Sequence, residues 1–140
     1  MKARGGYLKE KEARLFMSQI VEGMAALHGK NIIHRDLKPD NLLVEIECEN
    51  DASISNNFMK DFEISSTNIR VKLADFGFSK TLEPDELTGT RCGSPLFMAP
   101  EIIKYKKYSH NSDVWSLGCI FYEMIFGVVP FYAPQNNFFF

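Results

Sequence analysis

The sequence predicts an α+β fold that is mainly α-helical and contains one small β-hairpin. Two segments predict the helices: residues 10–28 are amphipathic, and residues 113–126 are apolar on nearly every side. Two short runs, 42–46 and 69–73, partly alternate between apolar and polar residues, which is typical of paired strands. The 140 residues are enough for one domain with a moderate hydrophobic core.

The first helix is predicted from the spacing of its apolar residues. At intervals of three and four, one face would carry Phe16, Ile20, Met24 and Leu27. Gly29 follows, and glycine is common where helices end, so it is a plausible C-terminal cap. Residues 32–33 then form a short apolar run that leads into a highly charged loop.

The segment between the two predicted strands, about residues 47–68, is rich in Ser, Asn and acidic residues. It is long for a hairpin loop, and its composition predicts a flexible, acidic insertion. A docking or phosphorylated loop is one interpretation, and a solvated loop without catalytic importance is the other.

The second half of the chain contains an irregular segment and then the apolar helix. Residues 75–99 show no steady period and contain several Gly and Pro, so we expect a long irregular connection. The helix predicted at Asp113–Phe126 is apolar nearly all round, and such helices belong in the centre of a domain.

Composition narrows the class of protein. Apolar residues make up 45% and charged residues 24%, as in an ordinary globular protein. The net charge of −2 gives no basic field for nucleic acid, and the apolar run 114–130 is short for a membrane span and includes Glu123. Three cysteines without C-x-x-C spacing suit a reducing compartment. We therefore expect a cytoplasmic protein with no membrane span and no nucleic-acid partner.

Four short motifs follow one another along the chain. They are His34-Arg35-Asp36-Leu37-Lys38-Pro39-Asp40-Asn41, then Asp75-Phe76-Gly77, then Ala99-Pro100-Glu101, then Asp113-Val114-Trp115-Ser116-Leu117-Gly118. A lone Asp-Phe-Gly occurs by chance, whereas the first motif is specific by itself. All four in this order leave little room for coincidence.

On these motifs the chain resembles the C-terminal lobe of a eukaryotic protein kinase, over about residues 7–133 without the insertion. The resemblance implies a mainly helical lobe whose small hairpin holds a catalytic loop. It also implies transfer of the ATP γ-phosphate, with Mg²⁺, to Ser or Thr of protein substrates. Lys38, two residues after Asp36, is similar to the Ser/Thr-specific form of the motif.

The resemblance assigns the chemistry to a few side chains. Asp36 would accept the proton of the substrate hydroxyl, and Lys38 would offer a positive charge to the transferred phosphate. Asn41 and Asp75 would hold Mg²⁺ through oxygen atoms, and Leu43 would form the floor under the adenine ring. Asp40, next to Asn41, is included in the cofactor site.

Other motif residues are expected to support this site. By resemblance, His34 and Phe76 are packing residues rather than chemical ones, and Gly77 completes the Asp75-Phe76-Gly77 motif. Asp113 would hold the catalytic loop through backbone hydrogen bonds. Glu101 would normally pair with an Arg further along the chain, which this sequence lacks.

The segment 88–95 resembles the end of a kinase activation segment. Thr90 lies where many such kinases carry an activating phosphate, and Arg35 is the natural group to bind it; an unmodified threonine is the alternative. Ser94 resembles the hydroxyl residue that bonds near Asp36 and favours Ser or Thr substrates. A basic group further on either selects acidic substrates or lies on a solvated helix face: Lys104, Lys106 and Lys107.

The branch of the family is indicated by three features together: residues 74–80, residues 92–101 and the long insertion. They resemble the autophagy-initiating, ULK-type kinases, although the calcium/calmodulin-dependent group shares several of them. No G-x-G-x-x-G precedes residue 31 and no V-A-I-K lysine is present, so by resemblance we expect the N-terminal lobe to be absent. The resemblance also implies that the last helices of the C-terminal lobe are missing.

Two functions remain open. The chain is either part of an active Ser/Thr kinase, or a non-catalytic lobe that acts as an interaction or decoy module. We expect the isolated chain to be inactive and marginally stable, because apolar surface at Leu43 and near Trp115, Phe121 and Met124 would lose its cover. Exposing several hundred Å² would cost about 5–10 kcal/mol at roughly 25 cal/mol per Å².

Overall fold

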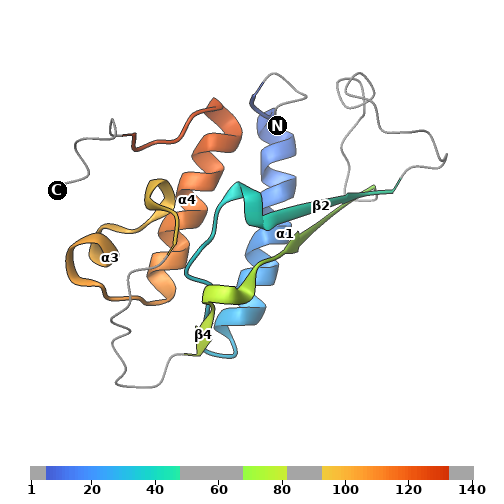
Figure 1. The fold of residues 1–140 in the computed structure, drawn as a ribbon. Coiled ribbons are helices and arrows are strands. Elements are labelled where there is room, and N and C mark those ends of the chain that lie inside the picture. Colours follow the sequence, from blue (N-terminus) through green and yellow to red (C-terminus); the bar gives the residue numbers. More distant parts are fainter. Residues whose placement is uncertain (1–5, 48–67, 82–92, 133–140) are drawn as a thin grey trace.

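The computed structural model describes residues 6–47, 68–81 and 93–132 (Figure 1). Two long helices, α1 (Glu10–His28) and α4 (His110–Phe126), pack side by side at its centre. The short helix α3 (Pro100–Tyr105) lies on the side of α4 that faces away from α1. The described residues also include three 3₁₀ turns: η2 (Pro39–Asn41), η3 (Phe76–Phe78) and η4 (Pro95–Phe97).

Two small antiparallel sheets frame the charged loop. Strand β2 (Leu42–Ile46) pairs with β3 (Ile69–Leu73), so that Leu42 lies opposite Leu73. This hairpin extends away from the helices, as Figure 1 shows. Strand β1 (Ile32–Ile33) pairs with β4 (Lys80–Thr81). The bounds predicted for α1, β2 and β3 are confirmed.

One side chain attaches the hairpin to the central helices. The Nε2 of Gln19 on α1 donates to the carbonyl of Ile69 at 3.1 Å, and its Oε1 accepts from the N–H of Val71 at 2.8 Å. Residues 69 and 71 present these groups on the edge of β3 that does not pair with β2. Gln19 therefore occupies the position of a neighbouring strand and satisfies backbone groups that are costly to leave unpaired.

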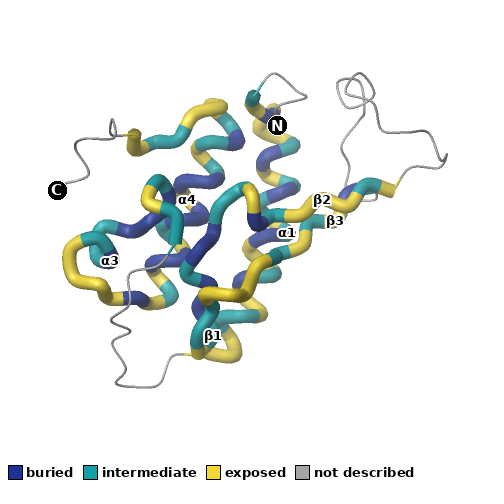
Figure 2. The backbone as a smooth tube through the Cα atoms, in the orientation of Figure 1, coloured by how far each residue is buried: buried dark blue, intermediate teal, exposed yellow. Residues whose placement is uncertain are grey.

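The core lies between α1 and α4, where buried residues gather in Figure 2. The predicted apolar face of α1 packs there, with Ile20 and Met24 almost fully buried and Leu27 partly buried. A second cluster joins the strand before the loop to α3: Ile33, Met98, Ala99, Ile102 and Tyr108. The first cluster includes Leu37 of the charged loop, and the second includes Ile33 just before it.

Helix α4 differs from the prediction in two respects. It begins at His110 rather than Asp113, because Ser109 precedes it as the N-terminal cap and donates its N–H to the Ser112 hydroxyl at 3.2 Å. It is also not buried all round: Val114, Tyr122 and Phe126 are exposed. Met124, which was expected near the exposed surface, is buried, since it faces α1.

Smaller features were also predicted incompletely. The β1–β4 pair was not predicted, because strands of two residues carry no periodic signal. Gly29 does end α1, but in a right-handed conformation with φ −62°, and the left-handed residue is Asn31 with φ 57°. The acidic insertion lies outside the described residues except for its ends, and so does Thr90. Within the described residues, no helix combines the length and apolarity that a membrane crossing requires.

Candidate active site

The first motif forms the loop that joins β1 to β2 and passes the N-terminal end of α4. Its polar residues His34, Asp36 and Asn41 are buried, with at most 6% of each residue exposed. Arg35 has φ 69°, a left-handed conformation that is uncommon outside glycine. Buried polar groups and a strained backbone persist only where surrounding contacts hold them, and such positions are frequent at functional sites.

Asp113 in the first turn of α4 holds the start of this loop. Its Oδ2 accepts the backbone N–H of His34 at 2.9 Å, and its Oδ1 accepts the N–H of Arg35 at 3.1 Å. The structure thus places Asp113 where the sequence predicted it, on the loop backbone. These bonds fix the two residues that come immediately before Asp36.

Asp36 lies at the centre of a hydrogen-bond network drawn from two parts of the chain. Its Oδ1 accepts from the Ser94 hydroxyl at 2.9 Å, and its Oδ2 accepts from Lys38 Nζ at 2.7 Å. Asn41 Nδ2 donates to the Asp36 carbonyl at 2.8 Å and to Oδ2 at 3.3 Å. The carboxylate is therefore held in one orientation by three side chains.

This network sets the charge of its members. Burial opposes the charge on Asp36, but hydrogen bonds from Lys38 and Ser94 outweigh it, so the pKa of Asp36 lies below its ordinary value. The hydrogen bond to Asp36 raises the pKa of Lys38, with further support from the charges of Asp40 and Asp75. Near neutral pH the site therefore contains a carboxylate and an ammonium group in contact.

The hairpin brings the two predicted Mg²⁺ ligands to the same end. Ala74 donates its N–H to the Asn41 carbonyl at 2.9 Å, so Asp75 follows directly after a residue bonded to Asn41. Because Asn41 Nδ2 bonds to Asp36, its Oδ1 is the atom suited to a cation. The Asp75 carboxylate is exposed and accepts from Gly77 N–H at 3.3 Å.

These residues fit Mg²⁺ bound together with nucleotide phosphates. Among the described residues, no three His, Cys, Asp or Glu side chains converge as a metal site. Mg²⁺ does not require such a cluster, since it commonly takes one or two carboxylates and completes its shell with water and phosphate oxygens. Asn41 would contribute an amide oxygen to such a shell, and Asp75 would contribute a carboxylate oxygen.

The surface next to this end of the hairpin carries the other predicted cofactor residues. Leu43 on β2 is 55% exposed. Asp40 in η2 is exposed, and its charge acts on Lys38. Asp40 precedes Asn41 within η2, and Leu43 lies two residues after Asn41, near the start of β2.

The two predicted packing residues, His34 of the first motif and Phe76 of the second, lie close to each other. The His34 ring is fully buried, lies 5.2 Å from the Phe76 ring and has its Nε2 3.1 Å from the Ala74 carbonyl. Phe76 is less buried than a packing role suggests, with 47% exposed. Asp75 has φ 60° and caps the η3 turn that contains Phe76 and Gly77.

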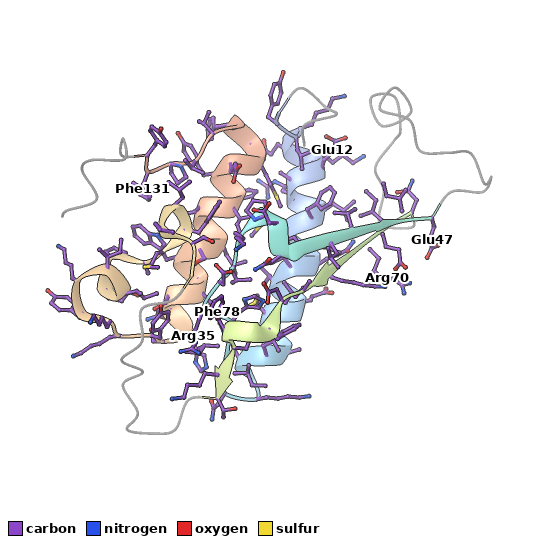
Figure 3. The ribbon with its side chains drawn as sticks, in the orientation of Figure 1. Glu12, Arg35, Glu47, Arg70, Phe78 and Phe131 are labelled. Atoms are coloured by element: carbon purple, nitrogen blue, oxygen red, sulfur yellow. The ribbon has the colours of Figure 1, made fainter. Side chains whose placement is uncertain are left out.

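Arg35 is turned toward two aromatic residues. Its Nε donates to the Phe78 carbonyl, and its guanidinium lies 5.4 Å from the centre of the Tyr108 ring; Figure 3 shows Arg35 beside Phe78. This cation–π geometry holds the group at the surface of the site. Thr90, its predicted phosphorylated partner, lies outside the described residues.

Glu101 has a partner within the chain. The Ser112 hydroxyl donates to Glu101 Oε1 at 3.0 Å, which ties α3 to the first turn of α4. The basic residues after it, Lys104, Lys106 and Lys107, are exposed, which agrees with a solvated face and leaves their role untested.

Sequence reasoning missed several residues that position the site. Gln19 attaches the hairpin to α1, and His28 contacts Asp113 with 3.0 Å between His28 Nε2 and Oδ2. Gly93 has φ 103°, and an added Cβ would lie 2.5 Å from the Arg35 carbonyl oxygen. The sequence held a usable signal for Gln19, because this polar residue lies next to the apolar face of α1. None existed for His28 or Gly93, whose contacts are distant in sequence.

Comparisons with known proteins agree with these motifs. The family model for the protein kinase domain matches residues 1–139. The chain is 43% identical over 128 residues to the serine/threonine-protein kinase ATG1c of Arabidopsis thaliana, and 44% identical over 131 residues to the serine/threonine-protein kinase ULK1 of Homo sapiens. It is 40% identical over 145 residues to the serine/threonine-protein kinase atg1 of Aspergillus oryzae. The chain therefore belongs to the protein kinase family.

The alignments cover most of this chain and a small part of each relative. They include 91%, 92% and 95% of the chain for the plant, human and fungal proteins. The corresponding shares of those proteins are 15%, 11% and 15%. The predicted resemblance to protein kinases, including the ULK-type branch, is confirmed by these matches.

Proposed function

We propose that the chain is the C-terminal lobe of a serine/threonine protein kinase of the ATG1/ULK1 branch, acting on protein substrates in autophagy. The observation that carries this proposal is the orientation of Asp36 by Lys38, Ser94 and Asn41. The small hairpin and the mainly helical arrangement support it, as do the names of the relatives. A cytoplasmic location, expected from the cysteine usage, is part of the same proposal.

Asp36 would orient the substrate hydroxyl and take its proton. Its lowered pKa makes it a weak base, which is acceptable because phosphoryl transfer passes through a loose transition state that needs little push from the nucleophile. Positioning then matters more than basicity, and the three hydrogen bonds on Asp36 supply it.

Lys38 would place a charge beside the transferred group. Its ammonium group already contacts Asp36 Oδ2, so the positive charge lies next to the carboxylate that would receive the proton. Asn41 and Asp75 would hold Mg²⁺ and ATP together with Lys38, Asp40 and Leu43. An ion held by these residues would supply positive charge against the charge that develops on the phosphates during transfer.

Phosphotransfer by the full-length protein tests this assignment. We expect Asp36→Asn to abolish transfer from labelled ATP to a Ser- or Thr-containing peptide while leaving the fold intact. Glu10→Gln is the matched control, since it makes the same carboxylate-to-amide change at an exposed pair on α1. Transfer retained by the Asp36 variant would reject Asp36 as the base.

We also propose that Arg35 binds a phosphate on Thr90. The guanidinium lies at the surface of the site, where it contacts the Phe78 carbonyl and the Tyr108 ring. A doubly charged phosphate would bind the guanidinium more strongly than either of these neutral groups. Activity of the full-length protein that depends on Thr90 phosphorylation, and is lost in Arg35→Ala, supports this.

An interaction module is the second candidate. Three exposed apolar residues favour it, because they lie around the site and would suit a protein partner: Leu43, Phe76 and Phe78. The mass of the native product, captured from cells, separates the two functions. A product near 16.0 kDa that binds peptides without phosphorylating them would favour the module, and a much larger, active product would favour the kinase.

A further inference from the structure

Two histidines meet behind the catalytic loop. His28 is the last residue of α1, and His110 is the first residue of α4. Their ring centroids are 4.5 Å apart with the planes tilted by 33°. The Nε2 of His28 lies 3.0 Å from Oδ2 of Asp113, one turn further along α4. The ends of the two central helices are thus joined by a ring pair and a carboxylate.

The same carboxylate oxygen serves His28 and the catalytic loop. Asp113 is only 2% exposed, and its Oδ2 also accepts the backbone N–H of His34 at 2.9 Å. Because Oδ2 accepts both bonds, a change in its contact with His28 alters the orientation of the carboxylate that holds His34 and Arg35. Asp36 is the next residue along the loop.

The two rings are not equivalent sites for a proton. His28 Nε2 faces a carboxylate, whereas His110 Nε2 is buried without a hydrogen-bond partner among the described residues. A buried charge without a partner is costly, and a second charge on a ring 4.5 Å away would be repelled by the first. Of the two rings, His28 is therefore the one whose nitrogen faces a carboxylate, and His110 packs against it.

The other charged or titratable groups near this pair face elsewhere. The His34 ring has its Nε2 on the Ala74 carbonyl. The Arg35 guanidinium is turned to the Phe78 carbonyl and the Tyr108 ring. Asp113 is thus the charged group in direct contact with His28 among the described residues.

We propose that His28 is a positioning residue whose proton state controls how firmly Asp113 holds the catalytic-loop backbone, and that His110 keeps that proton on His28. A proton on His28 turns its hydrogen bond into a charge-assisted one, which is about twice as strong as a neutral bond. The hold on the loop is therefore tighter when His28 carries the proton than when it does not. This inference goes beyond the proposed kinase function and does not depend on it.

Amide hydrogen exchange of His34 and Arg35 in the full chain tests the proposal. After correction for the intrinsic effect of pH, we expect about fivefold greater protection at about pH 6 than at about pH 8, a difference of the size between a charged and a neutral hydrogen bond. Two variants separate the rings. In His28→Gln, which retains a donor without a titratable charge, the pH dependence disappears; in His110→Phe, which retains the ring stack, it remains.

Several outcomes would overturn the proposal. They are equal protection at the two pH values in the unmodified chain, pH dependence that survives in His28→Gln, and loss of the dependence in His110→Phe alone. Should His28→Gln not fold, NMR titration of the unmodified chain decides: the His28 ring carbons and the His34 and Arg35 amides must shift with one midpoint, and separate midpoints reject the coupling. No readout involves phosphotransfer, so failure here is distinct from failure of the kinase assignment.

Discussion

The Ser94 hydroxyl donates a hydrogen bond to Oδ1 of Asp36 at 2.9 Å, although the two residues are 58 positions apart. The bond joins the segment before η4 to the catalytic loop and occupies the carboxylate oxygen that Lys38 leaves free. The orientation of the proposed base is therefore shared between distant parts of the chain, and each part can be tested separately.

Removing the Ser94 hydroxyl should slow the chemical step. A hydrogen bond to a charged group is worth about 1.5–3 kcal/mol, so Ser94→Ala in the full-length protein is expected to lower kcat by about 10- to 100-fold. KM for ATP should change little, because Ser94 contacts none of the proposed cofactor ligands other than through Asp36. Steady-state kinetics measure both constants, and an unchanged kcat would show that the bond has no catalytic role.

A methyl group added at Gly93, the residue before Ser94, should disturb the Ser94–Asp36 contact by displacing the backbone. Its Cβ would lie 2.5 Å from the Arg35 carbonyl oxygen, and φ 103° is strained for any other residue, so Gly93→Ala is expected to cost about 2–4 kcal/mol of stability. Gly118→Ala is the matched control in α4, where an added Cβ meets nothing within 4 Å. It should stabilise the chain by about 0.5–1 kcal/mol. Denaturant unfolding compares the two, and equal effects would contradict the clash.

Gln19 should determine how firmly the hairpin is attached to α1. Gln19→Leu leaves the N–H of Val71 and the carbonyl of Ile69 without these partners, at a cost of about 1–3 kcal/mol. Hydrogen exchange at Val71 should then become faster than in Ser18→Ala, which removes only a local bond to the Leu15 carbonyl. Unchanged protection of Val71 would mean that β3 does not need the side chain.

Glu123 should make stability depend on pH in the opposite sense to an ordinary surface carboxylate. Burial, and then the charge of Asp40, raise its pKa above the ordinary value of 4.5. Between 4.5 and the raised pKa, the folded chain binds more protons than the unfolded chain, so stability falls as pH rises through this window. Glu123→Gln removes the effect.

Thermal melts measure this difference. The Tm of Glu123→Gln should exceed that of the unmodified chain at about pH 7.5, and the gap should close at about pH 4, where both states hold the proton. Glu22→Gln on the exposed side of α1 serves as the control and should show no such trend. A gap that is the same at both pH values would exclude protonation of Glu123 as its cause.

The elements with local patterns were predictable. The apolar spacing along α1 and the runs of β2 and β3 gave the bounds that the structure shows, because each pattern repeats within its own element. The start of α4 was misplaced because Ser109 acts as its cap, and capping depends on where the preceding chain turns. The β1–β4 pair joins two-residue strands that are far apart in sequence, and nothing local marks it.

The sequence by itself determined which side chains carry the proposed chemistry, since Asp36, Lys38 and Asn41 lie within one short loop whose spacing is specific. Only the tertiary structure decided which carboxylate oxygen of Asp36 the Ser94 hydroxyl reaches, and that His28 meets Asp113 behind the loop. The physical reason is the packing of α1 against α4, which brings His28 within hydrogen-bond distance of Asp113, 85 positions further along the chain. Such contacts depend on the three-dimensional arrangement of the helices, and no spacing along the chain encodes them.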